Sequence, residues 1–201
     1  MGAIVSALIC ILALSGPAPA QQQVSAKSQA KLEGVFSKVL DRLWETNDRY
    51  WHTGQFERSI AVLRLITQIS PDDVQAYSDG AWMMENQDRD GDAEAFLLEG
   101  IRNNPESPDM LFELGHFYYM HERFDEAIRY LQSVLLREPH WRTWHLLAHA
   151  HEHTGNVEEA LSIWFRMLSE EDDPAVPQIQ IDRILSGGPP TRVLGMQHPV
   201  R

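Results

Sequence analysis

Cysteine is almost absent from the sequence, which has 201 residues and the single Cys10. Cys10 lies in an apolar N-terminal run that has the pattern of a secretory signal peptide, and cleavage of that peptide would remove it. The mature chain would then have no disulfide, no thiolate metal ligand and no cysteine nucleophile. We therefore expect packing alone to stabilise the fold, although exported proteins can form disulfides.

Charged side chains are absent from the first 26 positions, and Lys27 is the first to appear. The run from Ala3 to Leu14 is nearly all apolar, and Ala18–Ala20 forms an A-x-A cleavage pattern, although only the amino terminus supplies positive charge before the run. The run is shorter than the roughly 20 residues that a membrane-spanning helix needs. We predict a signal peptide at residues 1–20, export to the periplasm or the medium, and no stable membrane span after cleavage.

Basic residues are in the minority, since 17 Lys and Arg accompany 29 Asp and Glu for a formal net charge of −12. The predicted signal peptide contains no charged side chain, so the mature chain keeps this charge. An acidic protein repels phosphate backbones and anionic lipid headgroups, which argues against nucleic acid and anionic membranes as partners. A neutral or basic partner, or a metal ion, fits the charge better.

Motifs for catalysis are also missing. The sequence has no G-x-S-x-G and no glycine-rich phosphate loop after a strand, and no segment reads convincingly as a strand. Paired carboxylates such as Asp72 and Asp73 fall in solvated helix starts and turns. The acidic stretch from Asp88 to Glu99 lacks the glycine that a calcium loop needs at its sixth position, where Ala93 stands. We predict no enzymatic activity and no cofactor, and an enzyme remains the third hypothesis.

A helical hairpin is present between Asp109 and Pro139. Apolar and small residues recur there at helical spacing in two blocks, and Arg123–Asp125 interrupts the pattern between them. The first block contains Leu111, Leu114, Gly115 and Tyr118, and the second contains Ala127, Ile128, Leu131, Val134 and Leu135.

The hairpin is repeated, because Pro71, Pro105 and Pro139 stand 34 residues apart and each follows a helical pattern. This period, over roughly residues 40–174, resembles the tetratricopeptide repeat. The unit from Pro108 matches the family's pattern well, whereas the first unit has polar Thr46, Asn47 and Ser59 where the family prefers apolar or small residues. The positions that match in the best unit are Leu111, Leu114, Gly115, Tyr118, Phe124, Ala127 and Pro139.

The resemblance implies an all-α fold, a right-handed superhelical solenoid of about four helix-turn-helix hairpins with helical caps. The predicted division is a signal peptide (1–20), an N-terminal helical extension (21–39) that packs against or continues into the first repeat, a repeat array (40–174), a C-terminal capping helix (175–186) and a flexible tail (187–201). Terminal caps cover the apolar edges that end repeats would otherwise expose. The four repeats of the array are 40–73, 74–107, 108–140 and 141–174.

The resemblance also implies a concave binding face, formed by fixed positions of each repeat's first helix. Most of these positions are aromatic, histidine or acidic, and a large exposed aromatic area marks interaction sites. The predicted partner is another protein or peptide, held as a peptide or helix in this groove; self-filling of the groove by the chain's own termini is the alternative. Nothing in the pattern specifies an oligomeric state. The predicted groove residues are Trp44, Asp48, Trp51, His52, Trp82, Glu85, Phe112, His116, Tyr119, His145, His149 and Glu152.

One subclass of the family binds the C-terminal carboxylate of chaperones through Lys, Arg and Asn on this face. The corresponding positions here contain no basic clamp: they include Trp44, Asp48, Ser78, Trp82 and Phe112. The resemblance therefore does not imply carboxylate capture.

Histidines are concentrated between His116 and His153, which supports a second hypothesis of divalent-metal binding. His145, His149 and His153 are spaced i, i+4, i+8, so they lie within one arc of a helix with Glu152 beside them. Two histidines at i, i+4 can chelate zinc, and Glu152 or His116 could complete the site. Histidines on a groove also serve in hydrogen bonding and packing. We therefore predict no bound metal and keep metal binding as the alternative function.

Overall fold

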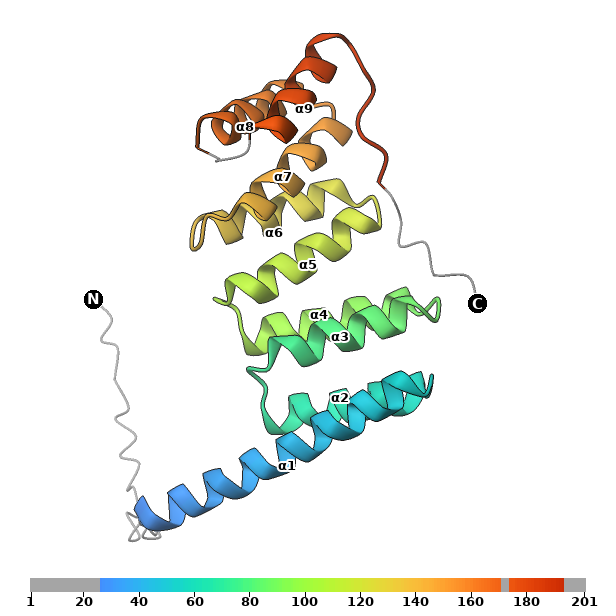
Figure 1. Cartoon of the computed structure of the whole chain (residues 1–201), viewed down its shortest axis with the longest axis vertical. Helices are drawn as coiled ribbons and strands as arrows, with labels where there is room; N and C mark the ends of the chain where they lie inside the picture. The colour runs from blue at the N-terminus through green and yellow to red at the C-terminus, as the bar shows by residue number, and fades with distance from the viewer. Residues whose placement is uncertain (1–25, 171–173, 194–201) are drawn as a thin grey trace, which may run out of the picture. The chain divides into compact units, whose positions relative to one another are not determined.

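The computed structural model describes residues 26–170 and 174–193, and it is entirely helical in secondary structure over these residues. Figure 1 shows helices that follow one another in chain order as antiparallel pairs. Within the described part, the helices are α1 (Ala26–His52), α2 (Phe56–Ile69), α3 (Val74–Glu85), α4 (Asp90–Asn103), α5 (Pro108–Met120), α6 (Phe124–Leu135), α7 (Trp141–His153), α8 (Val157–Glu170) and α9 (Ala175–Leu185).

The molecule is an all-α solenoid of stacked hairpins, as the repeat predicted. Helix α3 packs on α4, α5 on α6 and α7 on α8, and the second helix of each hairpin contacts the first helix of the next. The first helices also contact one another along the array, α3 with α5 and α5 with α7. One face of the array is therefore formed by first helices.

Of the described residues, 26–38 belong to one compact unit, and those from 39 onward belong to a second. Helix α1 is continuous from Ala26 to His52, so the predicted extension runs into the first helix of the array without a break. The predicted signal peptide lies outside the described residues. No helix in the described ranges combines the length and apolar character needed to cross a bilayer.

Turns between paired helices share one backbone feature, a residue in the left-handed region. It falls at Gly54 (φ 67°), Asp88 (φ 57°), Glu122 (φ 58°) and Gly155 (φ 79°). Added Cβ atoms at Gly54 and Gly155 would meet nothing within 4 Å, so backbone conformation rather than space favours glycine there. The structural repeat is thus visible in the turns, including the shorter spacing before Gly155.

Small residues let the paired helices approach closely. A Cβ built on Gly80 of α3 would lie 2.5 Å from Cε1 of Phe96 in α4, and one on Gly115 of α5 would lie 3.1 Å from Leu131 in α6. The core between the helices contains the fully buried Tyr77 and Leu114. Glycine inside these helices is therefore required by packing between helices.

Two polar residues that depart from the family's pattern pair with each other in the first hairpin. Asn47 of α1 and Ser59 of α2 are 5% and 0% exposed, and the Ser59 hydroxyl donates to Oδ1 of Asn47. A buried polar atom costs little when its hydrogen bond is made. Mutual hydrogen bonding thus explains how the first repeat tolerates both residues.

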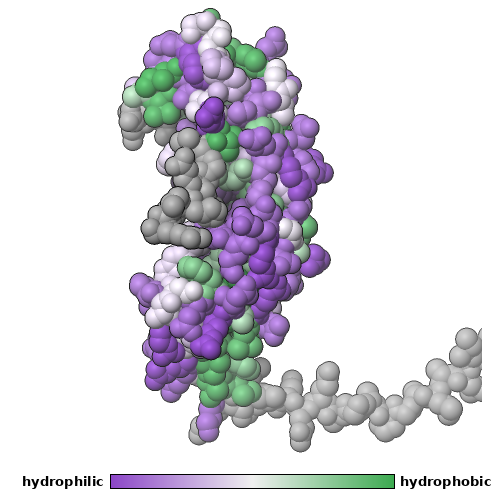
Figure 2. All heavy atoms as spheres, turned by 90° about the vertical axis from the view of Figure 1, so that its right-hand side faces the viewer, coloured by the Kyte–Doolittle hydropathy of each residue, from purple (hydrophilic) through white to green (hydrophobic). Residues whose placement is uncertain are grey.

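Apolar side chains remain exposed on the helices at both ends of the array. They include Leu65 on α2, Phe165 on α8 and Ile179 on α9, which are 43%, 49% and 62% exposed. Figure 2 shows hydrophobic residues gathered toward the two ends and hydrophilic residues over the middle of the face in view. End helices of a solenoid have one neighbour fewer, so part of their apolar face is left uncovered.

Candidate functional site

The first helices of hairpins one to three line three adjoining hollows. The largest, which we call the tryptophan pocket, has a volume of about 390 Å³ and lies between α1 and α3. The central pocket, of about 160 Å³, lies between α3 and α5, and the Phe112 pocket, of about 220 Å³, lies between α5, the end of α6 and the start of α7. The tryptophan pocket is lined by Trp44, Asn47, Asp48, Trp51, Asp79, Trp82 and Met83.

Indole rings form the walls of the tryptophan pocket. The Trp51 and Trp82 rings lie 4.9 Å apart between centroids at 50°, and Phe56 supports Trp51 from the side at 5.7 Å. Trp44 donates its indole N–H to Oδ2 of Asp73, 3.3 Å away, while the same carboxylate caps the start of α3 through the backbone N–H of Ala76. The position of the Trp44 ring is thus fixed by the helix cap of the next hairpin.

Two carboxylates accompany the indoles. Asp48 is exposed and lies 3.3 Å from Nδ1 of His52 at the end of α1. Burial raises the pKa of Asp79, and the nearby carboxylates of Asp73 and Glu113 raise it further, against a hydrogen bond from Gln75 that lowers it. The pocket therefore combines an apolar aromatic wall with negative charge, and its described lining residues include no Lys or Arg.

The central pocket continues this acidic surface. The Ser78 hydroxyl donates to Glu113 at 2.7 Å, and Nε2 of His121 lies 2.9 Å from Oε1 of Glu85. Burial raises the pKa of Glu85, and the hydrogen bond from His121 acts against that rise. Burial lowers the pKa of His116, which lines the same pocket. These contacts join hairpins two and three at the floor of the groove.

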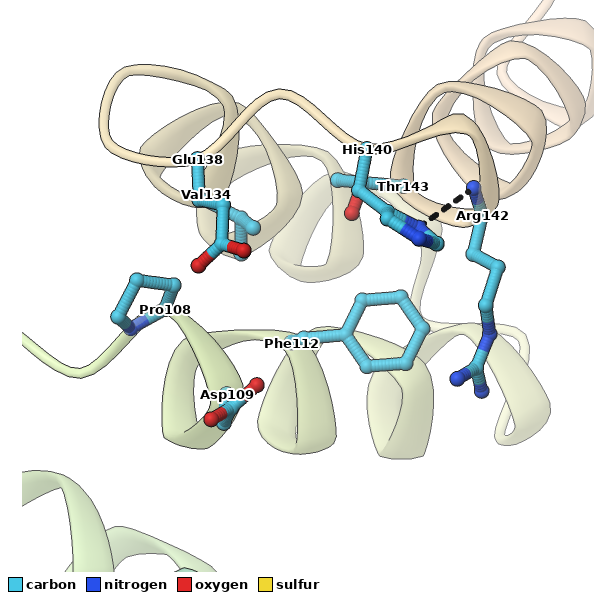
Figure 3. A pocket seen from close by; sticks show the side chains of 8 residues that line it. All are labelled: Pro108, Asp109, Phe112, Val134, Glu138, His140, Arg142 and Thr143. Atoms are coloured by element: carbon cyan, nitrogen blue, oxygen red, sulfur yellow. Dashed lines mark hydrogen bonds between the residues drawn. The ribbon is translucent and has the colours of Figure 1, made fainter.

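The Phe112 pocket differs from the other two in having an arginine, Arg142, among its lining residues. Figure 3 shows the Phe112 ring in the pocket between α5 and the connection from α6 to α7. The guanidinium carbon of Arg142 lies 5.1 Å from the Phe112 ring centroid, and the His116 ring is stacked against Phe112 with centroids 6.2 Å apart at 8°. His140 caps α7 by accepting the backbone N–H of Arg142 at 3.2 Å, as the dashed line in Figure 3 marks.

The predicted groove residues of the fourth hairpin face the protein interior. His149 and Glu152 are each 5% exposed. Glu152 accepts the indole N–H of Trp164 at 3.1 Å and pairs with Arg183 of α9. His145 packs edge-on against Trp164 at 5.3 Å, and burial together with the charge of His149 lowers its pKa to about 4. Glu152 at this end of the predicted groove is thus engaged by Arg183 of α9, which packs on α8.

The segment after α9 also covers the fourth hairpin. His153 stacks on Phe124 at 4.3 Å and 4°, and its Nε2 lies 3.0 Å from the carbonyl oxygen of Thr191. Arg183 donates to the carbonyl oxygens of Gly188 and Pro189. Residues 187–193, expected to be part of a flexible tail, are therefore held by hydrogen bonds; the rest of that tail lies outside the described residues.

The structure divides the predicted groove residues into two sets. Tyr119 joins the buried set: it is 7% exposed, and burial and the Glu152 carboxylate raise its pKa to about 12. Asp79, which the sequence did not single out, is a further lining residue of both the tryptophan pocket and the central pocket. The open set is Trp44, Asp48, Trp51, His52, Trp82, Glu85, Phe112 and His116, and the set at the covered end is Tyr119, His145, His149 and Glu152.

The metal hypothesis finds no support in the geometry. Over the described ranges, no group of three or more His, Cys, Asp or Glu side chains is arranged to hold a metal ion. Glu152 is engaged by Arg183 and Trp164, and His153 by Phe124 and Thr191. The i, i+4, i+8 spacing brings the His145 and His149 rings together at 4.8 Å, but it does not bring four ligands to one point.

A family model described as tetratricopeptide repeat matches residues 84–135 and 112–176. A crystal structure of MamA is 16% identical, with a TM-score of 0.59, over 70% of this chain and 83% of that chain. A thermophilic TPR protein of Thermus thermophilus is 16% identical, with a TM-score of 0.55, over 79% and 94%. A search of curated proteins finds no match.

An enzyme is also among the similar structures. A mutant of the O-GlcNAc transferase of Thermobaculum terrenum is 16% identical, with a TM-score of 0.56, over 69% of this chain but only 27% of that chain. At these identities the likenesses establish the fold alone, and the same fold occurs in proteins of different function.

Proposed function

We propose that this chain, whose residues 84–176 match the tetratricopeptide repeat model, is a non-enzymatic interaction protein whose concave face binds a peptide or helix of another protein. Proteins of this family bind other proteins. The observation that carries the proposal is the tryptophan pocket, an open hollow walled by Trp44, Trp51 and Trp82. Water-facing tryptophans in a concave site are the residues that most often dominate binding energy.

The working part of the groove extends over hairpins one to three. The tryptophan pocket and the central pocket adjoin through Asp79 and Trp82, which line both. The fourth hairpin is covered by α9, through Arg183 and Glu152, and by the segment that follows it. A bound segment therefore contacts α1, α3 and α5, and the covered end limits how far it extends.

We also propose that the protein works outside the cytoplasm, in the periplasm or as a secreted protein. The proposal rests on the uncharged apolar N-terminus and the A-x-A pattern before Gln21. Mass spectrometry of the protein purified from its native cells tests it. A mature N-terminus at Gln21 supports export, and an intact N-terminus in a cytosolic fraction contradicts it.

Affinity capture with residues 21–201 tests the binding function. We expect the wild-type chain to capture a partner. A Trp51→Ala, Trp82→Ala variant should capture less of it, by about tenfold or more, because removal of the two rings opens one wall of the pocket. Quantitative mass spectrometry of the captured proteins gives the ratio, and circular dichroism shows whether the variant stays folded.

Trp141→Ala provides the matched control, since Trp141 is 51% exposed and does not line any of the three pockets described above. This variant should capture the same partner at the wild-type level. Equal capture by the wild type and the folded double variant would exclude the tryptophan pocket as the working surface.

A further inference from the structure

We propose that the tryptophan pocket receives a cationic side chain, arginine or lysine, from the partner. The inference rests on the proposed function, because it specifies which chemical class of residue the same groove binds. It follows from the combination of indole walls, carboxylates and the absence of a positive lining residue in the described pocket.

The indole rings favour a cation over a neutral side chain. Trp51 and Trp82 meet at 50° with centroids 4.9 Å apart, so their ring faces form a corner rather than a closed stack. Trp44 forms a third wall, held by its hydrogen bond to Asp73. Tryptophan has the strongest quadrupole of the aromatic side chains, and a guanidinium or ammonium group over its face is attracted more as water is excluded.

The carboxylates supply the counter-charge that such a cation needs. Asp48 and Asp79 line the pocket on α1 and α3, and Asp73 lies behind Trp44. Burial raises the pKa of Asp79, a hydrogen bond from Gln75 acts against that rise, and the neighbouring carboxylates of Asp73 and Glu113 raise it further. A bound cation relieves this repulsion.

Within the described ranges, no Lys or Arg of this chain lines the tryptophan pocket or the central pocket, and His116 is the one histidine among their lining residues. His52 pairs with Asp48 at the surface, where the two side chains are 69% and 71% exposed, and Asp79 accepts a hydrogen bond from the neutral Gln75 at 2.5 Å rather than from a cation. Arg142, which lines the Phe112 pocket farther along the groove, lies over the Phe112 ring.

Other occupants fit less well. An apolar side chain would bury Asp48 and Asp79 against hydrocarbon and remove their hydration without a new partner, which is costly. An acidic side chain would meet carboxylates directly. Arginine has the best fit because its planar guanidinium can stack on an indole and still donate two hydrogen bonds to one carboxylate.

Binding of defined peptide pools to residues 21–201 tests the inference. The pools are ten-residue peptides of randomised neutral sequence without tryptophan, with a central residue fixed as arginine, lysine, citrulline, glutamate or leucine. Quenching of tryptophan fluorescence and thermophoresis measure Kd. We expect the arginine pool to bind about tenfold tighter than the citrulline pool, which has the same shape without the charge, and the glutamate pool to bind weakest.

A charge-neutralised variant identifies the residues responsible. Asp48→Asn with Asp79→Asn should reduce the advantage of arginine over citrulline to less than about threefold. Asp125→Asn with Glu158→Gln is the matched control: it removes the same charge from positions outside the pockets and should keep the tenfold advantage.

The outcomes separate the inference from the proposed function. Citrulline or leucine pools that bind as tightly as arginine, or an arginine advantage that survives Asp48→Asn, Asp79→Asn, would overturn the inference while the groove remains a binding surface. If no pool binds but a natural partner is captured through Trp51 and Trp82, the inference is likewise overturned and the groove remains a binding surface. Failure of that capture as well would end the proposed function.

Discussion

At the scale of single residues, the left-handed turn position is held by two glycines and by two residues that have a Cβ, Asp88 and Glu122. Gly54 and Gly155 hold this conformation in the first and last hairpins, whereas Glu122 holds it at φ 58° in the third. A side chain with a Cβ is strained in the left-handed region, by about 1–2 kcal/mol. Glu122 is exposed, so its side chain does not compensate through burial.

Glu122→Gly should stabilise the protein. We expect the free energy of unfolding to rise by about 0.5–1 kcal/mol, since relief of backbone strain exceeds the added entropy of glycine in the unfolded chain. Urea unfolding followed by circular dichroism measures the change. Glu122→Ala is the control, because it removes the carboxylate and keeps the strain; a gain equal to that of glycine would show that charge, not conformation, limits this turn.

At the scale of helices, buried polar pairs replace apolar packing at selected contacts. Asn47 and Ser59 join α1 to α2 in this way, and Arg123 joins hairpins two and three by pairing with Glu94 at 2.8 Å. The two contacts differ in kind: the first is buried within a hairpin, the second is half exposed between hairpins. We expect the buried pair to show the larger coupling energy, because exposed ion pairs contribute little.

Ser59→Ala should cost about 1–3 kcal/mol of unfolding free energy, because Oδ1 of the buried Asn47 loses its hydrogen-bond donor. The double variant Asn47→Ala, Ser59→Ala should cost less than the sum of the two single variants by at least about 0.5 kcal/mol. Denaturant unfolding of all four proteins gives the coupling. Additive costs would show that the two side chains contribute independently.

The sequence predicted the helices and their stacking because both follow from local spacing. The period of 34 residues placed the hairpins, and small residues such as Gly80 and Gly115 indicated close helix contacts. The open part of the site followed from the same register. The covered end did not, because Arg183 and Glu152 stand 31 positions apart and only the fold brings them together. Asp79 was missed for a similar reason, since its environment depends on carboxylates from other segments.

At the scale of the whole molecule, the histidines connect stability to pH. His145 and His149 pack against Trp164 at the covered end of the groove. The pKa of His145 is about 4, below the ordinary value of about 6.5 for histidine. In the unfolded chain, His145 is protonated as the pH falls below about 6.5, whereas in the folded chain it is protonated only near pH 4. Because the unfolded state binds this proton first, the group lowers the stability of the fold as the pH falls through that range.

Other groups act in the same interval. His116 and His151 also have pKa values lowered by burial and act in the same direction as His145. Asp79 and Glu85 have raised pKa values, so their contribution to stability increases as pH falls. The change of unfolding free energy with pH is therefore the sum of opposing contributions. A substitution of His145 alone is needed to isolate its contribution.

His145→Gln should flatten the acid limb of the stability curve. We expect the wild type to lose more Tm than the variant between about pH 7.5 and pH 5, because glutamine does not titrate. Calorimetry at several pH values gives the two curves, with His52→Gln at an exposed position as the control that follows the wild type. Parallel curves for wild type and His145→Gln would show that His145 is not responsible.

The closed end of the groove gives the binding surface a direction. Arg183 of α9 engages Glu152, and the carbonyl oxygen of Thr191 lies beside His153, so a peptide bound in the proposed groove would meet the chain's own C-terminal segment at its α7 side. We therefore expect the two orientations of such a peptide to differ in affinity. Selectivity would then include the polarity of the bound chain as well as the chemistry of its side chains.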